Sequence, residues 1–71
     1  MRTSKLRHMR ETRGMTQREV ADAIGVGQVI YFRYENGQRA VPYSAAKKLS
    51  KLYDVPLEDI FLPKMMTNRY F

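Results

Sequence analysis

Cysteine is absent from this chain of 71 residues, and histidine occurs once. Without cysteine there are no disulfide bonds and no thiolate metal ligands, and one histidine argues against a histidine-based metal site. No apolar run approaches the length of a membrane span, and the first residues lack the apolar stretch of a signal peptide. We therefore expect one small cytoplasmic domain with no membrane association, metal or cofactor.

The chain also lacks a set of side chains that could carry catalysis. Its histidine, His8, is expected on an exposed helix face, and no carboxylate pair accompanies a nucleophile. Nucleophilic catalysis needs an activating base within hydrogen-bonding reach of the nucleophile. The sequence therefore predicts a protein that is not an enzyme and has no small-molecule substrate.

Positive charge, by contrast, is abundant. Thirteen Lys and Arg against seven Asp and Glu give a formal net charge of +6 and a pI of about 10. Residues 1–19 hold six basic and two acidic side chains, whereas residues 54–59 hold three acidic side chains and no basic one. Such an excess favours polyanionic partners. The alternative is that the basic residues only keep a small protein soluble.

The stretch from residue 16 to residue 37 has the pattern of two short helices joined by a tight turn. Thr16 can cap a first helix, and Glu19 can reach back to the N–H group of the cap. Gly25 ends that helix, because glycine adopts the left-handed conformation that helix ends often need. A second helix follows from Gln28 to Asn36. This spacing is typical of a helix-turn-helix motif, whose second helix enters the DNA major groove.

Three further helices are predicted around this motif. The first runs from Ser4 to Arg13, the fourth from Ser44 to Tyr53, and a short fifth from Leu57 to about Leu62, between two prolines. The domain then covers residues 1–63, and residues 64–71 form a C-terminal tail in possible contact with a second subunit. The expected fold class is all-α.

Helical periodicity predicts which way the third helix faces. Gly27, Ile30, Tyr31 and Tyr34 recur on one side, which we expect to pack inward, with Gly27 where the helix before it passes close by. The opposite side presents Val29, Phe32, Arg33 and Asn36, and Gln28 projects from the N-terminus.

These outward side chains suit base edges in different ways. Gln28 can bind adenine and Arg33 can bind guanine in bidentate fashion, whereas Val29 and Phe32 can contact thymine methyl groups. A surface for a partner protein is the alternative for Val29 and Phe32. Phosphate contacts are expected at the helix ends and the following loop, with ordinary turn and solvent chemistry as the alternative. The phosphate candidates are Gln17, Asn36, Gln38, Arg39 and Tyr43.

An ordered set of residues over about 4–61 carries a family resemblance. The set comprises Leu6, Arg10, Gly14, Thr16-Gln17, Glu19-Val20-Ala21, Gly25-Val26, Tyr34-Glu35-Asn36-Gly37, Pro42 and residues 49–60. The chain resembles the Cro/C1-type (XRE) helix-turn-helix repressors of phages and bacteria. The resemblance implies a compact five-helix, lambda-repressor-like DNA-binding domain and an ion pair between Arg10 and Glu35. It places Gln17 and Asn36 at phosphates, and Gln28, Val29, Phe32 and Arg33 at base-reading positions.

The sequence departs from this family in two places. The usual small or polar residues of the reading helix are here Val29, Ile30 and Phe32, which leaves the sequence preference open and allows a partner protein there. Arg13 replaces an occasional apolar residue of the first helix.

The resulting hypothesis is a homodimeric transcriptional regulator, bacterial or phage-encoded, that binds double-stranded DNA at a near-palindromic operator. A single short helix reads too few base pairs for useful specificity, so we expect dimerisation. The candidate interface residues are Leu57, Phe61, Leu62, Met65, Met66, Tyr70 and Phe71. The rivals are a protein-interaction module on the same fold, such as an antitoxin or an anti-regulator, and non-specific coating of nucleic acid.

Overall fold

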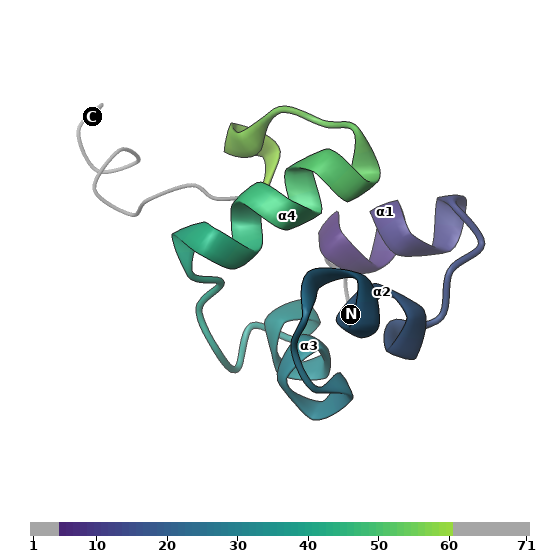
Figure 1. Ribbon diagram of the computed structural model, residues 1–71, viewed down its shortest axis with the longest axis vertical. Helices are drawn as coiled ribbons and strands as arrows, with labels where there is room; N and C mark the ends of the chain where they lie inside the picture. The colour runs from purple at the N-terminus through teal and green to yellow at the C-terminus, as the bar shows by residue number, and fades with distance from the viewer. Residues whose placement is uncertain (1–4, 61–71) are drawn as a thin grey trace.

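The computed structural model describes residues 5–60. Four α-helices follow one another: α1 (Lys5–Thr12), α2 (Gln17–Ile24), α3 (Gln28–Glu35) and α4 (Tyr43–Tyr53), and a 3-10 helix, η1 (Leu57–Asp59), comes last. No strand occurs within this range. Helix α2 packs on both α3 and α4, and α1 packs on α3 (Figure 1). The predicted all-α architecture is confirmed for the part of the chain described.

The helix boundaries around the central turn follow from local chemistry. The Thr16 hydroxyl accepts a hydrogen bond from the Glu19 N–H at 3.0 Å, and the Glu19 carboxylate accepts one from the Thr16 N–H at 2.9 Å. This reciprocal cap satisfies two N–H groups that the first turn leaves without helical partners. Gly25 ends α2 with φ at 75°, a left-handed conformation that is costly for most other residues. Both predicted boundaries are confirmed.

The prediction of a fifth helix from Leu57 to about Leu62 is not confirmed. After Pro56 the structure has the three-residue 3-10 helix η1, closed by hydrogen bonds to the carbonyl groups of Pro56 and Leu57. The few residues between Pro56 and Pro63 leave room for little more than one turn, and helix nucleation is too costly to be repaid over such a length. Residues 1–4 and 61–71 lie outside the described range, so the predicted helix start at Ser4 and the whole predicted tail, residues 64–71, lie outside it too.

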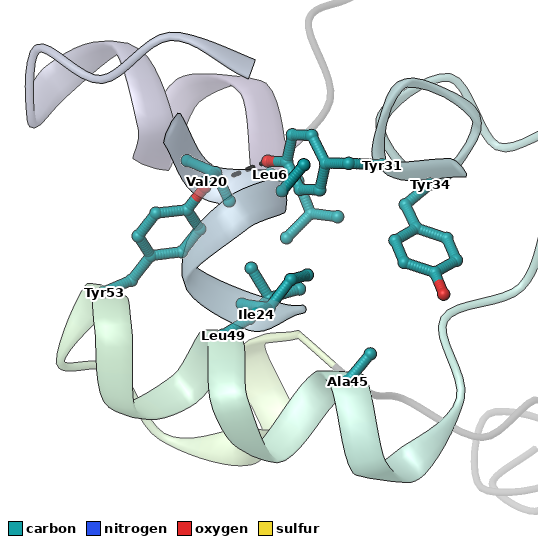
Figure 2. Close-up of a cluster of buried hydrophobic side chains, with 9 residues drawn as sticks. Leu6, Val20, Ile24, Tyr31, Tyr34, Ala45, Leu49 and Tyr53 are labelled. Carbon is teal, nitrogen blue, oxygen red and sulfur yellow. Dashed lines mark hydrogen bonds between the residues drawn. The ribbon is translucent and has the colours of Figure 1, made fainter. Parts of the chain in front are cut away.

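The hydrophobic core lies between α2, α3 and α4. Its largest fully buried side chains are Tyr31, Tyr53, Leu49 and Val20. The hydroxyl groups of Tyr31 on α3 and Tyr53 on α4 lie 2.9 Å apart and share a hydrogen bond (Figure 2). A buried hydroxyl without a partner costs free energy, so the two tyrosines satisfy each other where two apolar side chains would otherwise pack.

The expected close approach at Gly27 is wrong. Gly27 is the exposed N-cap of α3, with φ at −73°, and a Cβ atom added to it has no other atom within 4 Å. Glycine is therefore required at this position neither by its conformation nor by space.

Arg13, the departure from the family pattern in the first helix, has a structural explanation. Its guanidinium lies over the Tyr53 ring, 5.1 Å from the ring centroid, and donates a hydrogen bond to the Tyr53 carbonyl group. A cation over an aromatic ring is attracted by the negative face of the ring. The arginine therefore joins the end of α1 to the end of α4 in place of an apolar contact.

Candidate nucleic-acid interface

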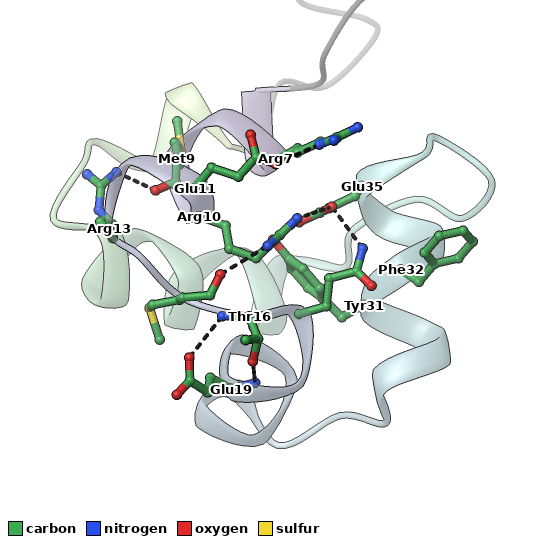
Figure 3. A network of polar contacts seen from close by, with 12 residues as sticks. Arg7, Met9, Arg10, Glu11, Arg13, Thr16, Glu19, Tyr31, Phe32 and Glu35 are labelled. Atoms are coloured by element: carbon green, nitrogen blue, oxygen red, sulfur yellow. Dashed lines mark hydrogen bonds and ion pairs between the residues drawn. The ribbon is translucent and has the colours of Figure 1, made fainter.

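Helix α3 has an inward and an outward face, and the predicted phase of this helix is confirmed. Tyr31 and Tyr34 are buried, at 0% and 7% exposure, and Ile30 packs partly buried against the core. Val29 and Phe32 are 61% and 45% exposed on the other side. Figure 3 shows Phe32 projecting from α3 on the side opposite the polar network that joins α3 to α1.

The four predicted base-reading residues share that outward face. Gln28, the first residue of α3, is exposed, as are Val29, Phe32 and Arg33. Gln28 and Phe32, like Val29 and Arg33, are four residues apart, a spacing that brings helical side chains next to each other. The face therefore combines two apolar side chains with one amide and one guanidinium.

A polar network holds the C-terminal end of α3 against α1 and α2. Arg10 Nε lies 2.6 Å from Glu35 Oε2, Arg10 Nη2 donates to Glu35 Oε1 at 3.4 Å, and Arg10 Nη1 donates to the Met15 carbonyl at 3.0 Å. Gln17 Nε2 donates to Glu35 Oε1 at 3.1 Å. The ion pair that the family resemblance implies between Arg10 and Glu35 is thus present, and it also includes the start of α2 (Figure 3).

The electrostatics of this network favour the charged forms of both partners. Burial raises the pKa of Glu35, but the hydrogen bonds from Arg10 and Gln17 lower it by more, so the carboxyl has a pKa below its usual value. The hydrogen bond to Glu35 raises the pKa of Arg10, despite the opposing effect of burial. The side chains of Arg10 and Glu35 are only 12% and 3% exposed, so solvent screens this pair weakly.

Gln17 has a role that sequence reasoning missed. It is a predicted phosphate ligand, and the structure places its half-buried amide on Glu35, eighteen residues along the chain. An amide NH₂ carries two hydrogens and its carbonyl oxygen is a separate acceptor, so one donated bond leaves the side chain able to make others. No sequence pattern within a single helix signals a contact of this range.

The side chain of Asn36, another predicted phosphate ligand, also forms a hydrogen bond within the protein. Its Nδ2 atom donates to the Phe32 carbonyl at 2.8 Å, and its backbone N–H donates to the same oxygen at 3.1 Å. The loop then folds back, with the Gln38 N–H bonded to the Arg33 carbonyl at 2.9 Å. Gln38 and Arg39 follow, both exposed. The loop residues predicted to contact phosphate therefore lie directly beyond the end of the outward face.

Tyr43, another predicted phosphate contact, opens α4 and is 54% exposed. The ammonium of Lys47 lies over its ring, 5.4 Å from the centroid. A groove of about 210 Å³ continues along this face of α4, lined by Ser44, Lys47, Lys48 and Lys51. Basic side chains thus continue from Arg39 in the loop onto α4, where Lys47, Lys48 and Lys51 line the groove.

Two other kinds of site are not found in residues 5–60. No three histidine, cysteine or carboxylate side chains are grouped so as to hold a metal ion. No helix in this range combines the length and apolar character needed to cross a bilayer.

Comparison with known proteins agrees with this geometry. The profile of a helix-turn-helix family matches residues 6–60. The cryptic phage CTXphi transcriptional repressor RstR of Vibrio cholerae is 40% identical over 60 residues, which cover 84% of this chain and 54% of the repressor. An HTH-type transcriptional regulatory protein of Pyrococcus furiosus is 36% identical over 64 residues, covering 86% of this chain and 20% of that protein. The chain therefore spans about half of the first relative and a fifth of the second.

Proposed function

The chain belongs to the Cro/C1-type (XRE) helix-turn-helix family, and from that premise we propose that it is a sequence-specific DNA-binding transcriptional regulator, acting as a repressor. Helix α3 enters the major groove, where a helix of this motif reads base edges. The observation that carries the proposal is the outward face of α3, on which Gln28, Val29, Phe32 and Arg33 are all exposed.

The proposed base readers divide by chemistry. Gln28 offers an amide that matches adenine N6 and N7, and Arg33 offers a guanidinium that matches guanine O6 and N7. Because both lie on a helix whose inward face is buried, each side chain faces the groove with its backbone already positioned. Such preorganisation lowers the entropy cost of binding.

The proposed phosphate contacts gather near the C-terminal end of α3. Gln17 opens α2 and bonds Glu35, the last residue of α3, and the loop with Asn36, Gln38, Arg39 and Tyr43 follows that end of the helix. Glu35 bonds both Gln17 and Arg10, so the same carboxylate holds α2 and α3 in one mutual orientation. Phosphate contacts there set the register of the reading helix without reading sequence themselves.

Homodimerisation completes the proposal. Two subunits related by a two-fold axis place their reading helices about 34 Å apart, one turn of DNA, and recognise a near-palindromic operator. Of the proposed interface residues, Leu57 lies in η1 and is half-buried, and the others lie outside the described residues. Analytical sedimentation at micromolar concentration tests this part: a dimer is expected, and a monomer alone contradicts it.

The direct test is selection of bound fragments from the source genome at stated salt, which is expected to return a palindromic consensus. Against that operator, Arg33→Ala is expected to cost about 1–3 kcal/mol and to relax preference at one base pair. Arg39→Ala removes the same charge from the loop, and its loss is expected to be similar for every sequence. Equal affinity of the wild-type protein for operator and random DNA contradicts the proposal and indicates non-specific coating.

One observation favours a second function, a protein-interaction module on the same fold. Val29 and Phe32 are large apolar side chains on the surface, and such exposure is a feature of protein interfaces as well. Phe32→Ala and Arg33→Ala separate the two functions. Loss of operator binding supports the regulator, whereas operator binding that stays intact while a co-purified protein partner is lost supports the interaction module.

A further inference from the structure

The outward face of α3 has an unusual composition for a surface that reads DNA. Val29 and Phe32, three residues apart, are the most exposed large apolar side chains on α3, and both lie outside the hydrophobic core. Neither side chain can donate or accept a hydrogen bond. Hydrogen-bond matching to bases is left to Gln28 and Arg33, because Asn36, whose Nδ2 is bonded to the Phe32 carbonyl, is assigned to a phosphate contact.

The major groove offers such side chains only one apolar feature, the C5-methyl group of thymine. Cytosine presents a hydrogen at C5 and an N4 amino donor beside it. An apolar side chain placed there removes water from that donor without replacing the lost hydrogen bond, which is unfavourable. A methyl group at C5, in contrast, buries apolar area against Val29 or Phe32.

The backbone around Phe32 keeps this side chain on the outside. The Phe32 carbonyl accepts from both the backbone and the side chain of Asn36, at 3.1 Å and 2.8 Å, which closes the last turn of α3. On the inward side, Tyr31 is bonded to Tyr53 and Glu35 to Arg10. Rotation of α3 that would bury Phe32 breaks these buried bonds, so the ring stays directed away from the core.

We infer that Val29 and Phe32 make operator binding dependent on the C5-methyl groups of pyrimidines, so that the protein distinguishes thymine from uracil and 5-methylcytosine from cytosine. This inference rests on the proposed function, since it assigns a ligand chemistry to the same reading helix. It goes beyond base identity, because 5-methylcytosine and cytosine pair with the same partner. DNA methylation at C5 then strengthens binding wherever a cytosine lies under either side chain.

Removal of one methyl group isolates the contact without altering the protein. Burial of one methyl-sized group changes affinity about fourfold, from a transfer free energy of about 0.8 kcal/mol and 1.4 kcal/mol per factor of ten. Each thymine of the selected half-site is replaced in turn by deoxyuridine, and dissociation constants are measured at one stated salt concentration. A loss of about fourfold is expected at the positions beneath Val29 and Phe32, with little change elsewhere.

Two variants identify which thymine position of the half-site lies under Val29 and which lies under Phe32. Phe32→Ala is expected to abolish the difference between thymine and uracil at one position and to retain it at the other, and Val29→Ala the reverse. Arg33→Gln is the matched control on the same face: it weakens binding but leaves both differences intact. At a half-site cytosine under either side chain, 5-methylcytosine is expected to bind about fourfold more tightly than cytosine.

The outcomes separate the inference from the proposed function. If the operator is bound but every deoxyuridine duplex binds within twofold of the original, the inference is wrong and the regulator stands. If Phe32→Ala and Val29→Ala weaken thymine and uracil duplexes equally, the side chains do not contact methyl groups. If no operator is selected and random DNA binds equally well, the proposed function itself fails. Circular dichroism of each variant verifies that the helices are retained.

Discussion

The inward and outward faces of α3 differ in the kind of side chain that each carries. The inward face carries the polar groups of Tyr31 and Glu35, both buried and both bonded to other helices. The outward face carries Val29 and Phe32, which are apolar and exposed. An ordinary amphipathic helix arranges these types the other way round.

This arrangement suggests a different role for each face of α3: the inward face (the holding face) fixes the position of the helix, and the outward face (the reading face) is proposed to contact DNA. Apolar packing alone is tolerant of small rotations, whereas hydrogen bonds require particular distances and angles. The inward hydrogen bonds to Tyr53 and Arg10 therefore fix the rotation of α3 about its own axis. Val29 and Phe32 are then presented in one direction, which suits the binding role proposed for this face. The following predictions test whether the two faces are separable in this way.

The largest expected effect comes from the inward face. Arg10→Met leaves Glu35 buried without its ion-pair partner and is expected to reduce the free energy of unfolding by about 3–5 kcal/mol. The double variant Arg10→Met, Glu35→Leu removes the uncompensated charge and is expected to regain much of that loss. Urea denaturation measures both. A double variant no more stable than the single one contradicts the idea that the unpaired charge is the main penalty.

A pH series examines the same carboxylate without mutation. The pKa of Glu35 is lower in the folded protein than in the unfolded chain, because its hydrogen bonds to Arg10 and Gln17 outweigh its burial. Its contribution is therefore fully present above the unfolded pKa, about 4.3, and is lost as the pH falls from there through the lower folded pKa. The urea midpoint of the wild-type protein is expected to fall more steeply over this range than that of the Arg10→Met, Glu35→Leu variant. Parallel profiles for the two proteins assign the acid sensitivity to other carboxylates.

A smaller effect is expected from the buried hydroxyl pair. Tyr53→Phe removes the bond between the two tyrosine hydroxyls while Tyr31 keeps its hydrogen bond to Glu35, and it is expected to cost about 1 kcal/mol in unfolding free energy. Phe32→Ser on the outward face is the comparison, and it is expected to stay within about 0.5 kcal/mol of wild type because Phe32 lies outside the hydrophobic core. Thermal unfolding at fixed pH reports both variants. Equal losses from the two substitutions contradict the division of α3 into a holding and a reading face.

The smallest effect concerns the turn that precedes both faces. Gly27→Ser supplies a side-chain cap to α3 at a position with an ordinary φ of −73° and open space for the Cβ atom. A gain of about 0.5 kcal/mol in unfolding free energy is expected, from the cap and from lower entropy of the unfolded chain. A loss of stability instead restores the view that α2 and α3 approach each other closely there. The same melting experiment suffices.

Sequence reasoning succeeded where the interacting groups are close along the chain. The Thr16–Glu19 cap and the left-handed Gly25 depend on residues within one helical turn, so their pattern is visible in the sequence. The direction of α3 follows from periodicity, because Tyr31 and Tyr34 recur on one side. The Arg10–Glu35 pair was available only through family resemblance, since twenty-five residues separate the two side chains.

Other features of the structure could not be predicted from the sequence, for a physical reason. The bond from Gln17 to Glu35 and the contact of Arg13 with Tyr53 join residues whose distance is set by helix packing, not by spacing in the chain. The close approach predicted at Gly27 failed because glycine at a helix start is compatible with several turn geometries. The 3-10 helix at Leu57–Asp59 was predicted as a longer helix, since apolar and acidic residues after a proline favour a helix start without fixing its length.

By itself, the sequence determined the four α-helices to within about one residue at their ends and the side of α3 that faces inward, because these depend on short-range hydrogen bonds and helical periodicity. Only the tertiary structure decided that one carboxylate, Glu35, bonds both Arg10 and Gln17 and so couples α1, α2 and α3. The reason is that a buried charge must find its partners wherever packing brings them, and packing joins residues that are distant in the chain.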